Sequence, residues 1–241
     1  MTIPRRTTLA LVATLALGAC AAPEDDAESA SAQTEDAIVG GVETFSNPAV
    51  GVTTLDGATG CSATLVSPNV IALAGHCFDA GRTTIAPWQF EIRKSANRAE
   101  WYRYDTSDGF VPLARNAGSD DIALLRLTQS VPASVATPIP IATGWPSWGT
   151  WLKVVGFGCT ERNAEGVGAG VKRTANLRYT PAWDVGLNSR VSCPGDSGGA
   201  LLGHGPVLLG NISGWGPTGF DHFGDLVKHR ALVQQQIDAW R

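Results

Sequence analysis

Residues 193–199 read Cys193-Pro194-Gly195-Asp196-Ser197-Gly198-Gly199, a glycine-rich turn around a single serine. The apolar residues 200–202 follow at once and predict a buried strand. Glycines on both sides of a serine let backbone N–H groups come close to a group that reacts at the hydroxyl. A serine hydroxyl is a weak nucleophile by itself, so a base and an orienting acid must come from elsewhere in the chain.

Two earlier segments contain such groups. His76 stands in Leu73-Ala74-Gly75-His76-Cys77, after a long apolar run, and Asp121 begins the strand-like stretch 121–127. An imidazole with a pKa near ~6.5 can take a serine proton near neutral pH, and a buried carboxylate can fix its tautomer. Taken singly, these residues have ordinary explanations as a surface histidine and a turn former. Together, and in this order, they indicate nucleophilic acyl transfer.

As a set, the segments resemble the serine proteases of the chymotrypsin/trypsin family over residues 38–241. The order His, Asp, Ser is that of the family and differs from the order in α/β-hydrolases and subtilisins. The resemblance implies that His76 is the general base, Asp121 the orienting acid and Ser197 the nucleophile. It also implies an oxyanion hole made by the N–H groups of Gly195 and Ser197. We therefore expect a serine endopeptidase that works through an acyl-enzyme.

Another function stays open, a catalytically inactive homologue that acts as a binding or regulatory protein. The complete triad and Gly195 argue against it. In its favour, the Ser-Trp-Gly segment of the family is here Ser213-Gly214-Trp215-Gly216, with one extra residue. Either Ser213 or Gly214 could occupy the position whose hydroxyl supports the buried aspartate in the family. A hydrolase on another fold, such as an esterase, is disfavoured by the triad order.

The composition excludes several other classes. The chain is 44% hydrophobic and 17% charged, an ordinary globular balance, and its 28 glycines and 14 prolines favour many short strands. The formal charge of −4, without a basic run, gives no reason to expect a nucleic-acid partner. No apolar stretch reaches the ~18–20 residues that span a bilayer. No cofactor is implied, and a metal site is disfavoured because the sequence has no Cys-x-x-Cys pair.

Residues 1–20 predict an export signal, with two arginines before a short apolar run. Leu17-Gly18-Ala19-Cys20 resembles a bacterial lipobox, which would make Cys20 a lipidated first residue; ordinary cleavage is the alternative. Residues 21–37 are rich in Ala, Ser, Glu and Asp and predict a flexible pro-segment or tether. We expect a bacterial lipoprotein precursor that meets the membrane only through the lipid on Cys20.

Ile38-Val39-Gly40-Gly41 resembles the mature N-terminus of the family. Cleavage between Ala37 and Ile38 would free an amino group, which by resemblance pairs with the carboxylate of Asp196. A buried carboxylate without a cation is costly, so this pair would hold the turn around the serine in place. We expect a membrane-tethered zymogen whose active form is released from the lipid and secreted. The alternative is that Ile38 simply begins a strand.

Four cysteines remain besides Cys20, and they allow three pairings. An even number in an exported chain suggests disulfides. By resemblance, Cys61–Cys77 braces the loop of the histidine. Cys193 occupies a family cysteine position whose usual partner is missing here, which leaves Cys159 and predicts the bridge Cys159–Cys193.

By resemblance, five residues form the primary specificity pocket: Val191, Ser192, Trp215, Gly216 and Gly224. Val191 stands at the floor, where trypsin-like members have an aspartate. Burying an Arg or Lys head against valine, with no opposite charge, costs several kcal/mol. We therefore expect an apolar residue before the scissile bond, at P1. The stretch 217–225 matches loosely, however, and a slip of one residue would place Asp225 on a pocket wall and favour a basic residue.

Short apolar runs bounded by Gly, Pro, Ser or Asn predict the strands of antiparallel barrels. The resemblance implies an all-β fold of two packed six-stranded antiparallel β-barrels, residues 38–137 and 138–241, with the triad in the cleft between them. The last stretch places Val233, Ile237 and Trp240 on one face of a C-terminal helix. We expect a monomer whose partners are protein or peptide substrates and protein protease inhibitors.

Overall fold

The computed structural model describes residues 38, 41–55, 58–78, 88–93, 100–110, 118–161, 167–182, 186–187, 191–215 and 220–241. The predicted signal and tether, Cys20 included, lie outside these residues, as do Val39, Gly40 and Gly216. The described chain is built from strands, one short 3₁₀ helix and one α-helix, so the all-β prediction is confirmed.

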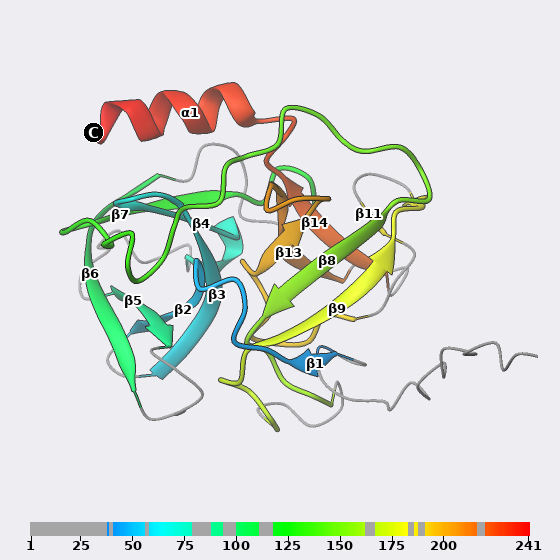
Figure 1. The fold of residues 1–241 in the computed structure, drawn as a ribbon, viewed down its shortest axis with the longest axis horizontal. Helices are drawn as coiled ribbons and strands as arrows, with labels where there is room; N and C mark the ends of the chain where they lie inside the picture. The colour runs from blue at the N-terminus through cyan, green and yellow to red at the C-terminus, as the bar shows by residue number, and fades with distance from the viewer. Residues whose placement is uncertain are drawn as a thin grey trace, which may run out of the picture. The chain divides into compact units, whose positions relative to one another are not determined.

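Six strands of the first half close into an antiparallel barrel in the order β2-β3-β4-β7-β6-β5, on the left of Figure 1. Their bounds are β2 (Val50–Leu55), β3 (Ala58–Ser67), β4 (Val70–Leu73), β5 (Trp88–Arg93), β6 (Trp101–Phe110) and β7 (Ala123–Leu127). The four apolar residues of β4 are all buried, whereas β6 buries Tyr104 and Thr106 and exposes the residue between them. This is the alternation of a strand with one face in the core. The first predicted barrel is confirmed.

Seven strands of the second half, together with β1 from the start of the described chain, form an eight-stranded sheet in the order β1-β9-β8-β12-β13-β14-β11-β10. Its strands are β1 (Val42–Glu43), β8 (Trp151–Gly156), β9 (Arg173–Arg178), β10 (Pro181–Ala182), β11 (Gly186–Leu187), β12 (Ala200–Leu202), β13 (Leu208–Trp215) and β14 (Asp221–Asp225). The sequence predicts a second closed six-stranded barrel, but the described strands here do not close. The two ends of the sheet are the two-residue strands β1 and β10.

The chain passes from the barrel to the sheet between Ile139 and Pro140. The N–H of Ile139 donates to the carbonyl of Leu65 in β3 at 2.9 Å, and the carbonyl of Pro140 accepts from the N–H of Leu208 in β13 at 2.9 Å. One hydrophobic cluster includes barrel residues such as Leu65 together with Phe157 from the second half. The two halves therefore share a core along their contact.

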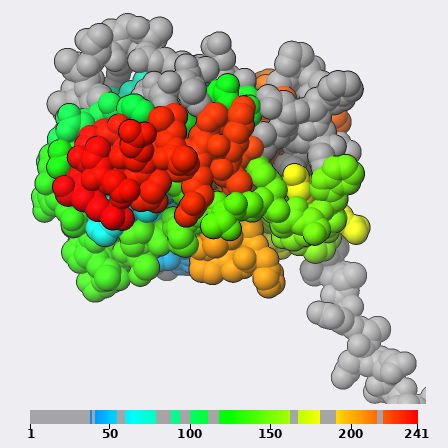
Figure 2. All heavy atoms as spheres, turned by 90° about the horizontal axis from the view of Figure 1, so that it is seen from above, coloured from blue at the N-terminus to red at the C-terminus, as the bar shows by residue number. Residues whose placement is uncertain are grey.

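The chain ends in α1 (Arg230–Ala239), which buries Val233 and Ile237 in that same cluster. Trp240 packs half-buried beside them, as the helical spacing predicts, and its carbonyl accepts from Asn69 Nδ2 at 3.0 Å. Figure 2 shows α1 on the surface, flanked by the green residues between β7 and β8. Within the part of the chain that the structure describes, no helix has the length and apolar character needed to cross a bilayer.

The docking of α1 gives a stability prediction. Ile237→Ala removes a buried side chain from the core, so we expect the free energy of unfolding to fall by about 2–5 kcal/mol. Gln235→Ala on the exposed face of the same helix is the matched control and should stay within about 0.5 kcal/mol. Urea unfolding followed by tryptophan fluorescence measures both. Equal effects of the two substitutions would mean that the helix does not contribute to the core.

Candidate active site

His76, Asp121 and Ser197 lie in one chain of contacts. Asp121 Oδ2 is 2.7 Å from His76 Nδ1, and His76 Nε2 is 2.9 Å from Ser197 Oγ. Both distances lie within the reach of roughly 2.6–3.2 Å that proton transfer requires. Asp121 is completely buried, whereas His76 and Ser197 are half-buried and open to a substrate.

Strand pairing explains how the first two residues meet. β4 and β7 are antiparallel neighbours, and Leu73 at the end of β4 stands opposite Ala123 at the start of β7. The 3₁₀ helix η1 (Gly75–Cys77) follows β4 at once and carries His76, while Asp121 comes two residues before β7. The same edge of the barrel therefore holds both side chains. Asp121 Oδ1 also accepts the backbone N–H of His76 at 2.8 Å, which fixes the loop.

Two residues of β13 support Asp121 from the second half. Ser213 Oγ donates to Asp121 Oδ2 at 2.5 Å and accepts the N–H of Gly118 at 3.1 Å. Asn211 is buried and its Nδ2 donates to the carbonyl of Asp121 at 3.0 Å. Sequence reasoning did not find Asn211; the signal was its spacing of two from Ser213 in a strand, which tends to place both on one face.

The extra residue of the Ser213-Gly214 segment is absorbed as a β-bulge. The register between β13 and β14 shifts between Ile212 and Gly214, and Gly214 has a φ of +132°, a conformation that favours glycine. The hydroxyl that contacts Asp121 is therefore that of Ser213, and the alternative that Gly214 takes this position is not what the structure shows.

Glycine is also required in the turn that carries Ser197. Gly195 has a φ of +96° and Gly198 a φ of +81°. A Cβ at Gly198 would lie 2.1 Å from the carbonyl oxygen of Ser62, so a larger residue does not fit there. The structure joins Cys159 to Cys193 beside this turn and Cys61 to Cys77 beside the histidine, the two pairings expected from the sequence.

Asp196, the other acid of the turn, is completely buried. Its Oδ1 accepts the N–H of Gly158 at 2.7 Å and its Oδ2 the N–H of Cys193 at 3.0 Å. Burial raises the pKa of Asp196 to about 7 although both hydrogen bonds act in the opposite direction. A Cβ at Gly156 or Gly158 would lie 2.2 or 2.5 Å from this carboxyl group, so these glycines make room for it.

Ile38 is buried in the apolar core of the second half. Its φ is +29°, in a region that β-branched residues avoid. The side chain is thus fixed in the core while the backbone at the same residue is strained.

A hollow of about 350 Å³ lies beside Ser197. It is lined by Ser192, Cys193, Pro194, Gly195, Ser197, Ile212, Gly214 and Trp215. Two of the predicted pocket residues, Ser192 and Trp215, are among them. Val191 is not, and Gly224 faces elsewhere, since a Cβ there would lie 2.5 Å from the carbonyl oxygen of Asp121. In the sheet, Gly224 pairs with Asn211, whereas Trp215 pairs with Asp221 beyond the bulge.

Asp221 is the acid behind this hollow, and sequence reasoning missed it. It is completely buried; its Oδ2 accepts the N–H of Val191 at 2.6 Å, and its Oδ1 accepts the N–H of Ser192 at 3.1 Å and the hydroxyl of Ser192. Asp225, the acid considered from the sequence, instead accepts from Trp145 Nε1 at 3.1 Å and does not line the hollow. The sequence feature that could have indicated Asp221 is an acid at the start of β14, within the stretch 217–225 that matches the family loosely.

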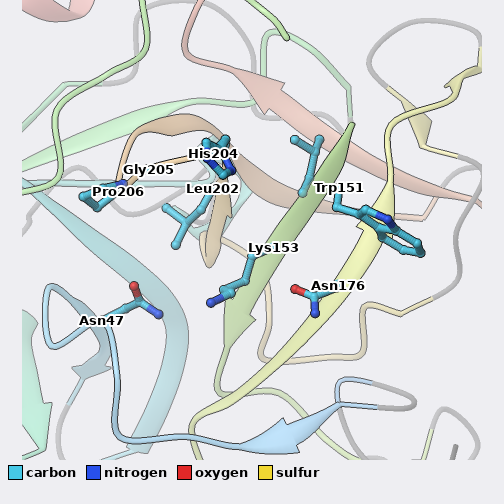
Figure 3. A pocket seen from close by; sticks show the side chains of 10 residues that line it. Asn47, Trp151, Lys153, Asn176, Leu202, His204, Gly205 and Pro206 are labelled. Atoms are coloured by element: carbon cyan, nitrogen blue, oxygen red, sulfur yellow. The ribbon is translucent and has the colours of Figure 1, made fainter. Parts of the chain in front are cut away.

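The described residues also include one cluster of metal-binding residue types and a hollow away from the triad. Among the described residues, Cys61, His76 and Cys77 are the cluster of metal-binding residue types whose ligand atoms lie within 4.8 Å, but both cysteines are joined in a disulfide. A second hollow, of about 360 Å³, contains no residue of the triad. Figure 3 shows Lys153 and Asn176 there on the neighbouring strands β8 and β9, with Asn47 across from them.

Solved structures of similar fold include mouse neuropsin, a serine protease expressed in the limbic system of the brain. It is 18% identical, with a TM-score of 0.66 over 82% of this chain and 98% of that chain. Human heparin binding protein is 19% identical, with a TM-score of 0.67 over 81% of this chain and 95% of that chain. At such identities the likeness shows the fold alone, and this fold serves both a protease and a heparin-binding protein.

No curated protein matches the sequence at a significant level. The family model described as Trypsin matches residues 38–223, which include the histidine, the aspartate, the serine and the residues that hold them. This match covers most of the chain and includes the closed barrel and nearly all of the second sheet. The chain belongs to the trypsin family.

Proposed function

We propose that this protein is a serine endopeptidase that hydrolyses peptide bonds through an acyl-enzyme. The observation that carries the proposal is the unbroken contact from Asp121 through His76 to Ser197, at 2.7 and 2.9 Å. The fold also occurs in a heparin-binding protein, so the fold does not decide between catalysis and binding. The complete triad beside a hollow favours catalysis.

The geometry supports a specific sequence of steps. Ser197 Oγ attacks the carbonyl carbon of the substrate while His76 Nε2 takes the hydroxyl proton, and the carbonyl oxygen accepts N–H groups of Gly195 and Ser197. The protonated His76 then gives its proton to the leaving amine, which leaves an acyl group on Ser197. Water then attacks this ester while His76 takes a proton from the water molecule. His76 passes this proton to the oxygen of Ser197 as the acyl group leaves. Asp121 orients the His76 ring and stabilises the imidazolium through Oδ2.

Active-site labelling tests the triad. We expect an organofluorophosphate to add once, on Ser197, in protein that starts at Ile38, because only a working triad and oxyanion hole activate the hydroxyl. Intact mass spectrometry measures the adduct. The Ser197→Ala variant and the uncleaved chain are the controls and should stay unlabelled. A folded, disulfide-bonded Ile38 form without an adduct would favour the inactive binding homologue.

We place activation at the bond between Ala37 and Ile38. Asp196 is buried with two neutral N–H donors, so a new cation beside it would be stabilising. The φ angle of Ile38 is defined by the carbonyl carbon of the preceding residue, so cleavage there removes the strained torsion while the side chain stays in the core. The freed amine would pair with Asp196. Cleavage would also separate the enzyme from a lipid on Cys20, so we propose an exported precursor whose active form is released.

The burial of Asp196 predicts that stability depends on pH differently in the uncleaved chain and in the form that starts at Ile38. Its pKa in the folded chain is raised to about 7, so the folded state binds more protons than the unfolded state between the ordinary pKa of an aspartate and about 7. Stability of the uncleaved chain therefore falls as pH rises through this range. In the Ile38 form the amine pairs with the ionised carboxylate of Asp196. The loss of stability with rising pH should therefore largely disappear.

Urea unfolding at about pH 5 and about pH 8 measures this, in a Ser197→Ala background that prevents self-digestion. Asp196→Asn in the uncleaved chain is the control and should remove most of the pH dependence. The same pH dependence in cleaved and uncleaved protein would contradict the pairing of Ile38 with Asp196.

For substrate choice we propose an apolar P1 residue. The hollow presents apolar groups such as Ile212 and Trp215. Both oxygens of Asp221 already accept hydrogen bonds from Val191 and Ser192, so this carboxylate is occupied rather than open to a Lys or Arg head.

A panel of peptide nitroanilides that differ only at P1 tests this choice. We expect kcat/KM for apolar P1 residues to exceed that for Lys by roughly tenfold or more, the size expected when a charge enters an apolar site without a free partner. Asp221→Asn should change the apolar substrates and the Lys substrate alike. A preference for Lys that Asp221→Asn abolishes would show that Asp221 reads the substrate directly.

A further inference from the structure

Ser62 connects the barrel to the turn that carries the nucleophile. It belongs to β3, in the first half of the molecule, and is completely buried. Its hydroxyl donates to the carbonyl oxygen of Gly195 at 2.8 Å and accepts the N–H of Phe157 at 3.0 Å. Both partners come from the second half, so one side chain crosses between the halves at the oxyanion turn.

The bond to Gly195 acts on a residue that has little conformational restraint of its own. Gly195 lacks a Cβ and has a φ of +96°. The peptide group on its N-terminal side is held by Cys159, whose N–H donates to the carbonyl of Pro194 at 3.0 Å. The peptide group on its C-terminal side is held by Ser62. This second peptide group is also held at its other end, because the N–H of Asp196 donates to the carbonyl of Cys193 at 2.9 Å. The Gly195 N–H belongs to the first peptide group, so Ser62 acts on it only through the torsion angles of Gly195 that connect the two groups.

Ser62 also borders the other side of the nucleophile. Its carbonyl oxygen lies so close to Gly198 that a Cβ there would approach it to 2.1 Å. The hydroxyl of Ser62 accepts the N–H of Phe157. The next residue, Gly158, donates its N–H to Asp196 Oδ1 at 2.7 Å. The neighbour of Ser62 in sequence, Cys61, is bonded to Cys77 beside the histidine. This one residue thus contacts the turn on both sides of Ser197.

We propose that Ser62 is a positioning residue of the oxyanion hole, whose hydroxyl holds the Gly195 carbonyl and, through it, the Gly195 torsion angles that point the N–H of this residue toward the reacting carbonyl oxygen. The inference rests on the proposed function. Ser62 touches neither the substrate nor the reacting atoms and acts through Gly195. Its loss should therefore weaken stabilisation of the tetrahedral intermediate and leave substrate binding nearly unchanged.

Kinetics of Ser62→Ala and Ser67→Ala test this. Ser67 is a buried serine in the same strand whose hydroxyl contacts Asn69 and no residue of the turn, so it is a matched control. We expect Ser62→Ala to lower kcat by roughly tenfold or more, with KM within about twofold, and Ser67→Ala to match wild type. A kcat within about twofold of wild type, a change in KM alone, or an equal loss in both variants would overturn the proposal.

Crystal structures separate this inference from the proposed function. If the wild-type Ile38 form does not hydrolyse peptides, the proposed function fails, and the structures of wild type and Ser62→Ala still decide the role of Ser62. A Gly195 N–H that points away from Ser197 Oγ in the variant supports this role of Ser62. An unchanged turn in the variant overturns it. If Ser62→Ala does not fold, a crystal structure of the wild-type protein bound to a peptide boronate tests the role of Ser62 instead. Ser62 Oγ must then stay on the Gly195 carbonyl while the Gly195 N–H donates to a boronate oxygen.

Discussion

The structure depends on the burial of one carboxylate, that of Asp121. An ionised carboxylate away from water is stable only with several donors, and here they come from both halves of the molecule. Oδ1 accepts the backbone N–H of His76, and Oδ2 faces His76 Nδ1 and the hydroxyl of Ser213. The first contact orders the histidine loop and the last draws β13 of the sheet against the barrel. The alignment of the triad and the junction of the two halves are therefore one arrangement.

Three aspartates close to the site are completely buried, and each is satisfied differently. Asp121 is held mainly by side chains, Asp196 by two backbone N–H groups, and Asp221 by backbone N–H groups together with the hydroxyl of Ser192. For Asp196 the donors are not enough to offset burial, and its pKa is raised to about 7. The turn around Ser197 thus contains an acid that a cation would stabilise, which is the physical basis of the proposed activation.

The sequence allowed the barrel, the C-terminal helix and the two cysteine pairs to be predicted, because these follow from local patterns and from the family resemblance. It also named the three residues that the structure brings into contact, since the motifs around His76, Asp121 and Ser197 carry them. The lining of the hollow could not be predicted as well. Gly224 was expected there and faces Asp121 instead, and Asp221 was not considered. Pocket residues depend on how β13 and β14 pair; the extra residue at Ser213-Gly214 can be seen in the sequence, but the register of the two strands around it cannot.

That bulge separates the support of Asp121 from the strand pairing beyond it. An inserted residue in the middle of a paired strand would normally turn every following side chain to the other face. Here the irregularity is confined to Ser213, which has no partner in the register of β14; its hydroxyl contacts Asp121, while Gly214 and Trp215 pair again with His222 and Asp221. One extra residue at this point therefore changes the strand pairing beyond it, next to the hollow, and leaves the contact between the two halves at Asp121 in place.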